Sequence, residues 1–429
     1  MTYYVDSVSG KPENDGLSEK TPKNHYRSLD IKPGDTVLIK AGSIFRDCLA
    51  SPDGEEGKPI TWDMYGVGAK PLFLGSVDIS DPAMWKETDD KNIWAYTDTF
   101  PSDVCNLIFG EDECCGVLAW EYEDLNEQGK WHYTYMGYDI DGRYVPPEIA
   151  KLPKVLYVYS AGNPAAFYGH IECAVFGHRC LLSGRQYINF NNMSGKYTGV
   201  HVYGQSNVKS VSIKNCDFRF VGGCVWDRIQ RIRFGNGIEI WEYGEDVTVE
   251  NCYFDQVYDS CTTHQGFINK QPCLRINIVN NTFKNYGMAA YELRDLIALD
   301  SHFDNNLCIG AGRGFSLQGE TPPRKSELWP QPMGHHLFIW RIYHATENGC
   351  ITVRGNVFYD APYGAAVYST IAPEAEKQLR FENNVYYKNE DDYLIRLGGK
   401  NYGKNEFETY QAEQENDRGS RVEDIFAGV

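Results

Sequence analysis

Residues 211–218 read VSIKNCDF and residues 247–254 read VTVENCYF, and variants of this pattern return along the second half of the chain. Apolar and polar side chains alternate over the first half of each copy, as in a β-strand with one buried face. The strand breaks at Asn-Cys, Asn-Asn or Gly-Asn and then resumes with an aromatic or aliphatic residue one or two positions later. The other copies are INIVNNTF at 276–283, HFDNNLC at 302–308, ITVRGNVF at 351–358 and LRFENNVY at 379–386.

The spacing of these copies predicts a solenoid. Successive copies begin about 25 to 50 residues apart, and the longer steps have room for loops. Each unit is too short to bury its own apolar face, so neighbouring units must stack. We expect a parallel β-helix whose turn residues form a ladder, with asparagine amides bonded to one another and the two cysteines as small buried filler. The ladder residues are Cys216, Cys252, Asn281, Asn306, Asn356 and Asn384.

The N-terminal part of the chain carries a family resemblance. It reads YYVDSVSGKPENDGLSEKTPKNHYRSLD at 3–30, KPGDTVLIKAGSIFRD at 32–47 and EGKPITWDMYGVGAKPLFLGS at 56–76. With the repeats, these segments resemble the right-handed parallel β-helix proteins of the pectate-lyase-like superfamily, most of which act on carbohydrates. The resemblance implies the fold and leaves the reaction open, since this fold hosts hydrolases, lyases, epimerases and non-enzymes. The paired-Asp and Gly-His-Gly motifs of polygalacturonases and the Asp-His strand of pectate lyases are absent.

The repeats also predict the domain organisation. We expect an all-β, single-stranded right-handed parallel β-helix over residues 1–400, followed by a polar C-terminal tail or cap at 401–429. Two aromatic, loop-rich segments interrupt the pattern, at about 81–155 and 319–349. Loops of this length inside a compact repeat are usually functional.

Composition excludes several classes of protein. A net charge of −18 over 429 residues argues against nucleic acid and anionic membranes as partners. No apolar run is long enough to span a membrane. The start, MTYYVDSVSGK, shows no secretory signal, which predicts a cytoplasmic protein, or a secreted one if this is a mature form. Thirteen cysteines without finger spacing predict reduced thiols and no structural zinc.

The strands between successive turns can be aligned to find what faces outward. The alignment gathers two Glu, a His, an Arg, a Trp and a Gln on four adjacent rungs, which an idle surface would not be expected to do. One outward column is predicted to hold His201, Glu239, Thr262, Glu292, Ser316 and Val367. The next outward column is predicted to hold Tyr203, Trp241, His264, Arg294, Gln318 and Ser369. These columns predict a substrate cleft.

The paired carboxylates favour glycoside hydrolysis. Glu239 and Glu292 lie two rungs apart, so their backbones are separated by roughly 9–10 Å. A carboxyl separation of about 6.5–9.5 Å is typical of inverting glycosidases. Glu292 beside Arg294 is expected to be ionised and to act as base, and Glu239 beside Trp241 to act as general acid. The expected substrate is an oligosaccharide or polysaccharide, and exo action is expected if the long loops close one end of the groove.

Other side chains are expected to complete the cleft. His264, between the two glutamates, is a candidate catalytic residue. Asp259, Glu242 or Asp295 would be a nearer carboxylate for a retaining mechanism. An adjacent His335-His336 pair points in opposite directions on a strand and so predicts no metal site. The candidate substrate-binding residues are Trp241, Gln265, Asp259, Gln318, Arg313, Trp340 and His336.

Two other functions stay open at this point. A polysaccharide lyase or epimerase would use Arg294 or Arg341 to neutralise a uronate, with His264, Tyr291 or a lysine as base. In that case Ca²⁺ held by acidic residues such as Glu242 could assist, whereas no cofactor is expected for a hydrolase. A non-catalytic carbohydrate-binding solenoid is the second alternative. The sequence predicts no oligomeric state.

Overall fold

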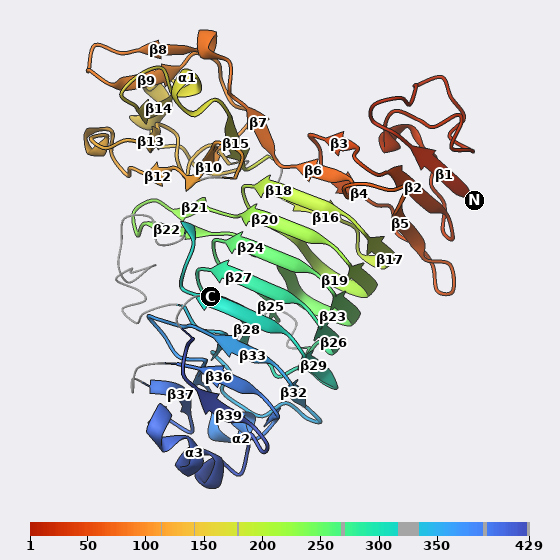
Figure 1. The fold of residues 1–429 in the computed structure, drawn as a ribbon, viewed down its shortest axis with the longest axis vertical. Coiled ribbons are helices and arrows are strands. Elements are labelled where there is room, and N and C mark those ends of the chain that lie inside the picture. The colour runs from red at the N-terminus through yellow and green to blue at the C-terminus, as the bar shows by residue number, and fades with distance from the viewer. Residues whose placement is uncertain are drawn as a thin grey trace.

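The computed structural model describes residues 1–112, 114–140, 142–177, 180–266, 271–315, 334–388 and 393–426. Over these residues the chain winds into a stack of short strands, which Figure 1 shows running from the N-terminal strands down to helix α3 (Phe407–Gln414). Two long sheets make up the stack, and their pairings are parallel apart from one terminal hairpin. The parallel β-helix predicted from the repeats is confirmed.

The larger sheet supplies two faces of the β-helix. Strands β19 and β23 are long and pass through both faces, because the first part of β23 pairs with β25 and its second part pairs with β26. The strands of this sheet are β1 (Thr2–Val5), β2 (Thr36–Lys40), β4 (Leu49–Ala50), β5 (Ile60–Tyr65), β16 (Cys180–Ser183), β17 (Gln186–Asn191), β19 (His201–Lys214), β23 (Ile238–Glu250), β25 (Ser260–Gln265), β26 (Leu274–Val279), β28 (Ala289–Arg294), β29 (Ser301–Asp304), β31 (Leu337–Trp340), β32 (Ile351–Arg354), β34 (Val367–Thr370), β35 (Leu379–Glu382), β37 (Tyr393–Leu397) and β38 (Lys400–Gly403).

The smaller sheet forms the third face. Its strands are β3 (Ile44–Phe45), β6 (Leu72–Leu74), β18 (Ser194–Thr198), β20 (Asp217–Val221), β24 (Tyr253–Val257), β27 (Thr282–Tyr286), β30 (Leu307–Ala311), β33 (Val357–Tyr359), β36 (Val385–Tyr387) and β39 (Arg421–Glu423). Inward side chains from all three faces form one continuous apolar core. Phe218, Phe254 and Phe283 stack along its axis, with ring centroids 5.2 and 5.3 Å apart. Burial of such columns is the main force that holds successive rungs together.

The predicted asparagine ladder runs through the turn between the second and third faces. The backbone N–H of Asn306 donates to Oδ1 of Asn356 at 2.8 Å, and the N–H of Asn356 donates to Oδ1 of Asn384 at 3.0 Å. Residues just before the ladder positions, such as Asn305 at φ 56°, adopt the left-handed conformation that asparagine tolerates. Cys216 and Cys252 are buried. The ladder and the filler role of the cysteines are confirmed.

The first excursion is a small β unit with its own core. It extends from β7 (Ser76–Asp78) to β15 (Ile171–Val175), beyond the predicted 81–155, because apolar strands on both sides pack around Trp131 and Tyr133. Its other elements are β8 (Trp85–Glu87), β9 (Ile93–Tyr96), β10 (Val104–Phe109), β11 (Cys114–Cys115), β12 (Val117–Leu118), β13 (Lys130–Tyr133), β14 (Leu156–Tyr159) and helix α1 (Pro164–Tyr168). We call residues 76–175 the inserted unit.

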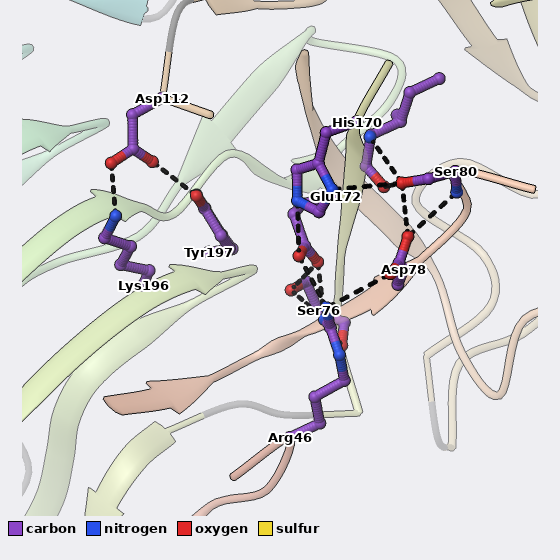
Figure 2. A network of polar contacts seen from close by, with 10 residues as sticks. Arg46, Ser76, Asp78, Ser80, Asp112, His170, Glu172, Lys196 and Tyr197 are labelled. Atoms are coloured by element: carbon purple, nitrogen blue, oxygen red, sulfur yellow. Dashed lines mark hydrogen bonds and ion pairs between the residues drawn. The ribbon is translucent and has the colours of Figure 1, made fainter. Parts of the chain in front are cut away.

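Charged side chains fasten the inserted unit to the β-helix, as Figure 2 shows. Glu172 of β15 is buried and accepts two hydrogen bonds from the guanidinium of Arg46, at 2.7 and 2.8 Å. Ser76 donates to the same carboxylate at 2.6 Å, and Nε2 of His170 lies 3.0 Å from it. Because Arg46 belongs to the first coil, this network fixes the orientation of the inserted unit. A bidentate arginine–carboxylate pair is among the more directional polar contacts.

The C-terminal segment is part of the fold. Beyond the predicted boundary at residue 400, β39 pairs in parallel with β36 and extends the third face. Phe407 and Tyr410 of α3 are buried in the main core, so this helix caps the last rung. Residues 319–333 of the second predicted excursion lie outside the described residues, and the part after them supplies strand β31. A short helix α2 (Pro373–Glu376) follows β34.

Two further features bear on the expectations from composition. No helix in the described part of the chain is long and apolar enough to cross a membrane. The thirteen cysteines, all within the described ranges, are free thiols.

Candidate functional site

Two glutamates lie in one outward column of the first face. Strand register pairs Glu239 of β23 with Thr263 of β25, and Thr263 with Glu292 of β28. The glutamates are therefore two rungs apart, about 9–10 Å between backbones. In the next outward column the register places Trp241, Gln265, Arg294 and Trp340 side by side. We call Glu239, Glu292 and these four residues, with the turn residues that contact them, the carboxylate cluster.

Glu292 lies at the centre of this cluster and is buried. The indole Nε1 of Trp340 donates to its Oε1 at 2.8 Å, and Oγ of Ser260 lies 3.3 Å from its Oε2. Burial, followed by the charge of Asp259, raises the pKa of Glu292 to about 7. Arg294 opposes this effect without overcoming it. The prediction that Arg294 keeps Glu292 ionised is wrong, because desolvation outweighs the guanidinium.

Glu239 is held by a different set of donors. Nδ2 of Asn236 donates to Oε2 of Glu239 at 2.7 Å, and Nε2 of His201 lies 3.5 Å from the same oxygen. The orientation of the Asn236 amide is fixed, because its Oδ1 accepts the backbone N–H of Ser260 at 2.9 Å. The backbone N–H of Asn236 in turn donates to Nδ1 of His201 at 3.1 Å. Glu239 is thus an acceptor at each of these contacts.

One asparagine connects the two carboxylates. Asn236 bonds to Glu239 through its Nδ2 and to Ser260 through its Oδ1, and the hydroxyl of Ser260 bonds to Glu292. Asn236 and Asp259 lie in turns just before β23 and β25, outside the strand alternation. Sequence reasoning missed Asn236 for that reason, although the Gly-Asn-Gly at 235–237 marks a turn beside a candidate strand.

Arg294 contacts both tryptophans of the carboxylate cluster. The guanidinium of Arg294 lies over the rings of Trp241 and Trp340, at 5.8 and 5.3 Å from their centroids. Its Nε donates to Asp295 at 3.0 Å, and Arg341 lies 3.6 Å from the same carboxylate. Arg294 is therefore held by an adjacent acid and by aromatic rings.

His264 faces the interior and not the cleft. The alignment of its strand was one residue out of register, since β25 pairs Gln265, not His264, with Trp241 and Arg294. Its ring is buried, with Nδ1 3.2 Å from the hydroxyl of Tyr291, and burial lowers its pKa to about 3. The predicted catalytic and sugar-binding roles of His264 are wrong, because its polar strand gave no apolar alternation to fix the register.

His336 is also an interior residue. It lies just before β31, packs beside Phe358 and contacts the hydroxyl of Tyr286, and burial lowers its pKa to about 3. Its predicted place in the cleft is therefore wrong, since the segment expected to be a loop is a core strand. Arg313 lies after β30, where it pairs with Asp360 at 2.6 Å. Gln318, the last predicted binding residue, lies outside the described residues.

The structure gives no positive indication of a metal site. Among the residues that it describes, no three His, Cys, Asp or Glu side chains are grouped so as to hold an ion. The absence of a cofactor stays a prediction.

Comparison with known proteins identifies the architecture. The chain is 23% identical over 398 residues to a lacto-N-biosidase of Bifidobacterium longum subsp. longum, a match that covers 85% of this chain and 23% of that protein. The chain thus spans under a quarter of the length of this relative. No family model matches the sequence.

Solved structures resemble the fold at low sequence identity. XylC, solved in complex with xylose, superposes with a TM-score of 0.57 at 11% identity, covering 98% of this chain and 83% of its own. A glycoside hydrolase superposes with a TM-score of 0.50 at 11% identity, covering 99% of this chain and 96% of its own. The predicted right-handed parallel β-helix is confirmed.

Proposed function

We propose that the protein is a glycoside hydrolase that uses Glu292 as general acid and Glu239 as the second carboxylate. One observation carries the proposal: two outward glutamates lie two rungs apart, and one of them has a pKa of about 7. A carboxyl group that is protonated near neutral pH can donate a proton to a glycosidic oxygen. The lacto-N-biosidase relative and the β-helix fold support this class of reaction.

The surroundings of the two glutamates support this division of roles. Glu292 is enclosed by Trp340, Ser260 and neighbouring rungs, which disfavours its charged form. Glu239 is the more exposed carboxyl and accepts N–H donors, which suits it to accept a proton from an attacking water. The roles are the reverse of those expected from Trp241 and Arg294 alone. With backbones roughly 9–10 Å apart, the pair supports inversion, and we extend the proposal to exo action on oligosaccharides.

Two of the bases expected for a lyase, His264 and Tyr291, are buried, which leaves a lysine as the remaining candidate. His264 and Tyr291 contact each other inside the core, so neither side chain faces the outer surface of β28 where a uronate would bind. The geometry therefore favours hydrolysis over elimination.

A panel of oligosaccharides tests the proposed reaction. Glycans that end in lacto-N-biose, and xylo-oligosaccharides, would be incubated in heavy-oxygen water and followed by mass spectrometry. We expect one heavy oxygen per cleavage, at the newly formed reducing end, and an inverted anomeric configuration in an immediate NMR spectrum. Products with new ultraviolet absorbance and no heavy oxygen would show elimination instead, and binding without products would show a non-catalytic solenoid.

The pH profile reports on Asp259. In the wild-type enzyme, kcat/KM is expected to fall as pH rises through about 7, because Glu292 then loses the proton that it must donate. Asp259→Asn removes the like charge that helps to raise this pKa, so the alkaline limb should move to lower pH. Asp300→Asn, at a largely exposed position, should leave the profile unchanged.

The same variant tests the assignment of the second carboxylate. Loss of activity in Asp259→Asn at every pH would make Asp259, not Glu239, the partner of Glu292. An unchanged alkaline limb would show that the charge of Asp259 does not act on Glu292.

A further inference from the structure

An exposed tryptophan is connected to the carboxylate cluster through two intervening side chains. Trp226 belongs to a hairpin of β21 (Cys224–Asp227) and β22 (Ile232–Phe234), which leaves the β-helix between β20 and β23. The residue is 58% exposed. Single exposed apolar residues are common on protein surfaces, so the role of this indole depends on how it is held and on what it contacts.

The indole is held in place although it is exposed. The guanidinium of Arg143 lies over the ring at 5.1 Å, and its Nη1 donates to the carbonyl of Trp226 at 2.8 Å. The same nitrogen donates to the carbonyl of Gly137 at 2.9 Å, so the inserted unit fixes the hairpin. The ring of Phe234 packs against the indole nearly edge-on, at 5.4 Å between centroids. An aromatic ring held on two sides is preorganised and loses little entropy when a ligand binds.

A continuous row of side chains leads from this ring to Glu239. Phe234 contacts Trp226 on one side and the ring of His201 on the other, at 5.7 Å between centroids. Nε2 of His201 lies 3.5 Å from Oε2 of Glu239. Packed side chains therefore connect the exposed indole to the carboxylate cluster, with His201 buried between them.

We infer that Trp226 stacks on a sugar ring of the substrate at a subsite remote from the bond that is cleaved, an inference that rests on the proposed function. A pyranose offers an apolar face of C–H groups that suits the exposed face of an indole. The inserted unit has a purpose in this arrangement, because Arg143 and Gly137 hold the hairpin that presents the ring. The protein thus binds a chain of several sugars and not only the unit that it releases.

Kinetics on long and short substrates tests this subsite. In Trp226→Ala, KM for lacto-N-tetraose is expected to rise about tenfold with little change in kcat, because the contact is made equally in ground and transition states. Hydrolysis of the 4-nitrophenyl glycoside of lacto-N-biose, which is too short to reach the hairpin, should be unchanged. Phe167→Ala is the matched control, since Phe167 of α1 is 56% exposed and lies on the inserted unit.

A binding measurement separates this inference from the proposed reaction. Lacto-N-tetraose and xylotetraose are titrated calorimetrically into the Glu292→Gln variant with and without Trp226→Ala. A weaker Kd by about tenfold for either tetrasaccharide supports the subsite even if no substrate is cleaved. Equal affinity with and without the indole, or no binding of either tetrasaccharide at millimolar concentration, overturns it. If the wild type cleaves these substrates and Trp226→Ala has the same KM, only this inference fails.

Discussion

Glu292→Gln is expected to lower kcat for a natural oligosaccharide by about three orders of magnitude, because an amide cannot donate the proton that the leaving oxygen requires. The loss should be much smaller for a 4-nitrophenyl glycoside, whose leaving group departs without protonation. Glu239→Gln should be impaired on both substrates, since its role is to activate the nucleophile. The comparison of the two substrates, by initial rates, therefore separates acid from base.

The matched control is Glu245→Gln. Glu245 lies on the second part of β23, pairs with Arg275 at 2.9 Å and faces away from the cluster. This variant should retain wild-type rates. Thermal melting of each variant would show that the fold is intact. Wild-type turnover of natural substrate by Glu292→Gln would exclude Glu292 as the acid.

Asn356→Ala is expected to destabilise the β-helix by about 4 kcal/mol, since buried groups that lose a hydrogen bond cost about 1–3 kcal/mol each. Asn356 is fully buried, accepts the N–H of Asn306, and donates to the carbonyl of Phe303 and to Oδ1 of Asn384. Its removal leaves groups on both neighbouring rungs without this partner. Urea denaturation would measure the loss.

Two variants make this stability prediction specific. Asn126→Ala, on an exposed loop of the inserted unit, should change the free energy of unfolding little. Asn356→Asp would turn a buried carboxylate oxygen toward the carbonyl of Phe303 and Oδ1 of Asn384, so at neutral pH its loss is expected to be at least as large as that of Asn356→Ala. If Asn356→Ala is no less stable than Asn126→Ala, the ladder does not hold the rungs together.

The fold could be predicted because its signal is repeated. The motif around Asn281, Asn306 and Asn384 recurs with the same strand on either side, and each copy requires a neighbour to bury its apolar face. The inserted unit gave no repeat of its own. The bounds of the inserted unit are therefore seen only in the structure, where apolar strands such as β15 pack around Trp131.

The site was predicted in part, and register explains the difference. Glu239 and Glu292 sit in strands with clear alternation, so their shared column followed from the sequence. Strand β25 places Thr262 and His264 inside the core. In a sequence, a polar residue that faces inward cannot be told from one that faces outward. Strand β31 was not predicted, because it lies within a long segment that was expected to be a loop. Asn236 and Asp259 lie in turns, where alternation carries no information.

The inserted unit also bears on how the β-helix is assembled. Strand β6 pairs directly with β18, so paired residues of two neighbouring rungs lie about 120 residues apart in the sequence. Contacts between residues so far apart in sequence form slowly, because the intervening chain must first be brought to a compact state. Later rungs follow one another after much shorter connections. Folding is therefore expected to begin in the C-terminal coils, with the N-terminal coil added once the inserted unit has folded.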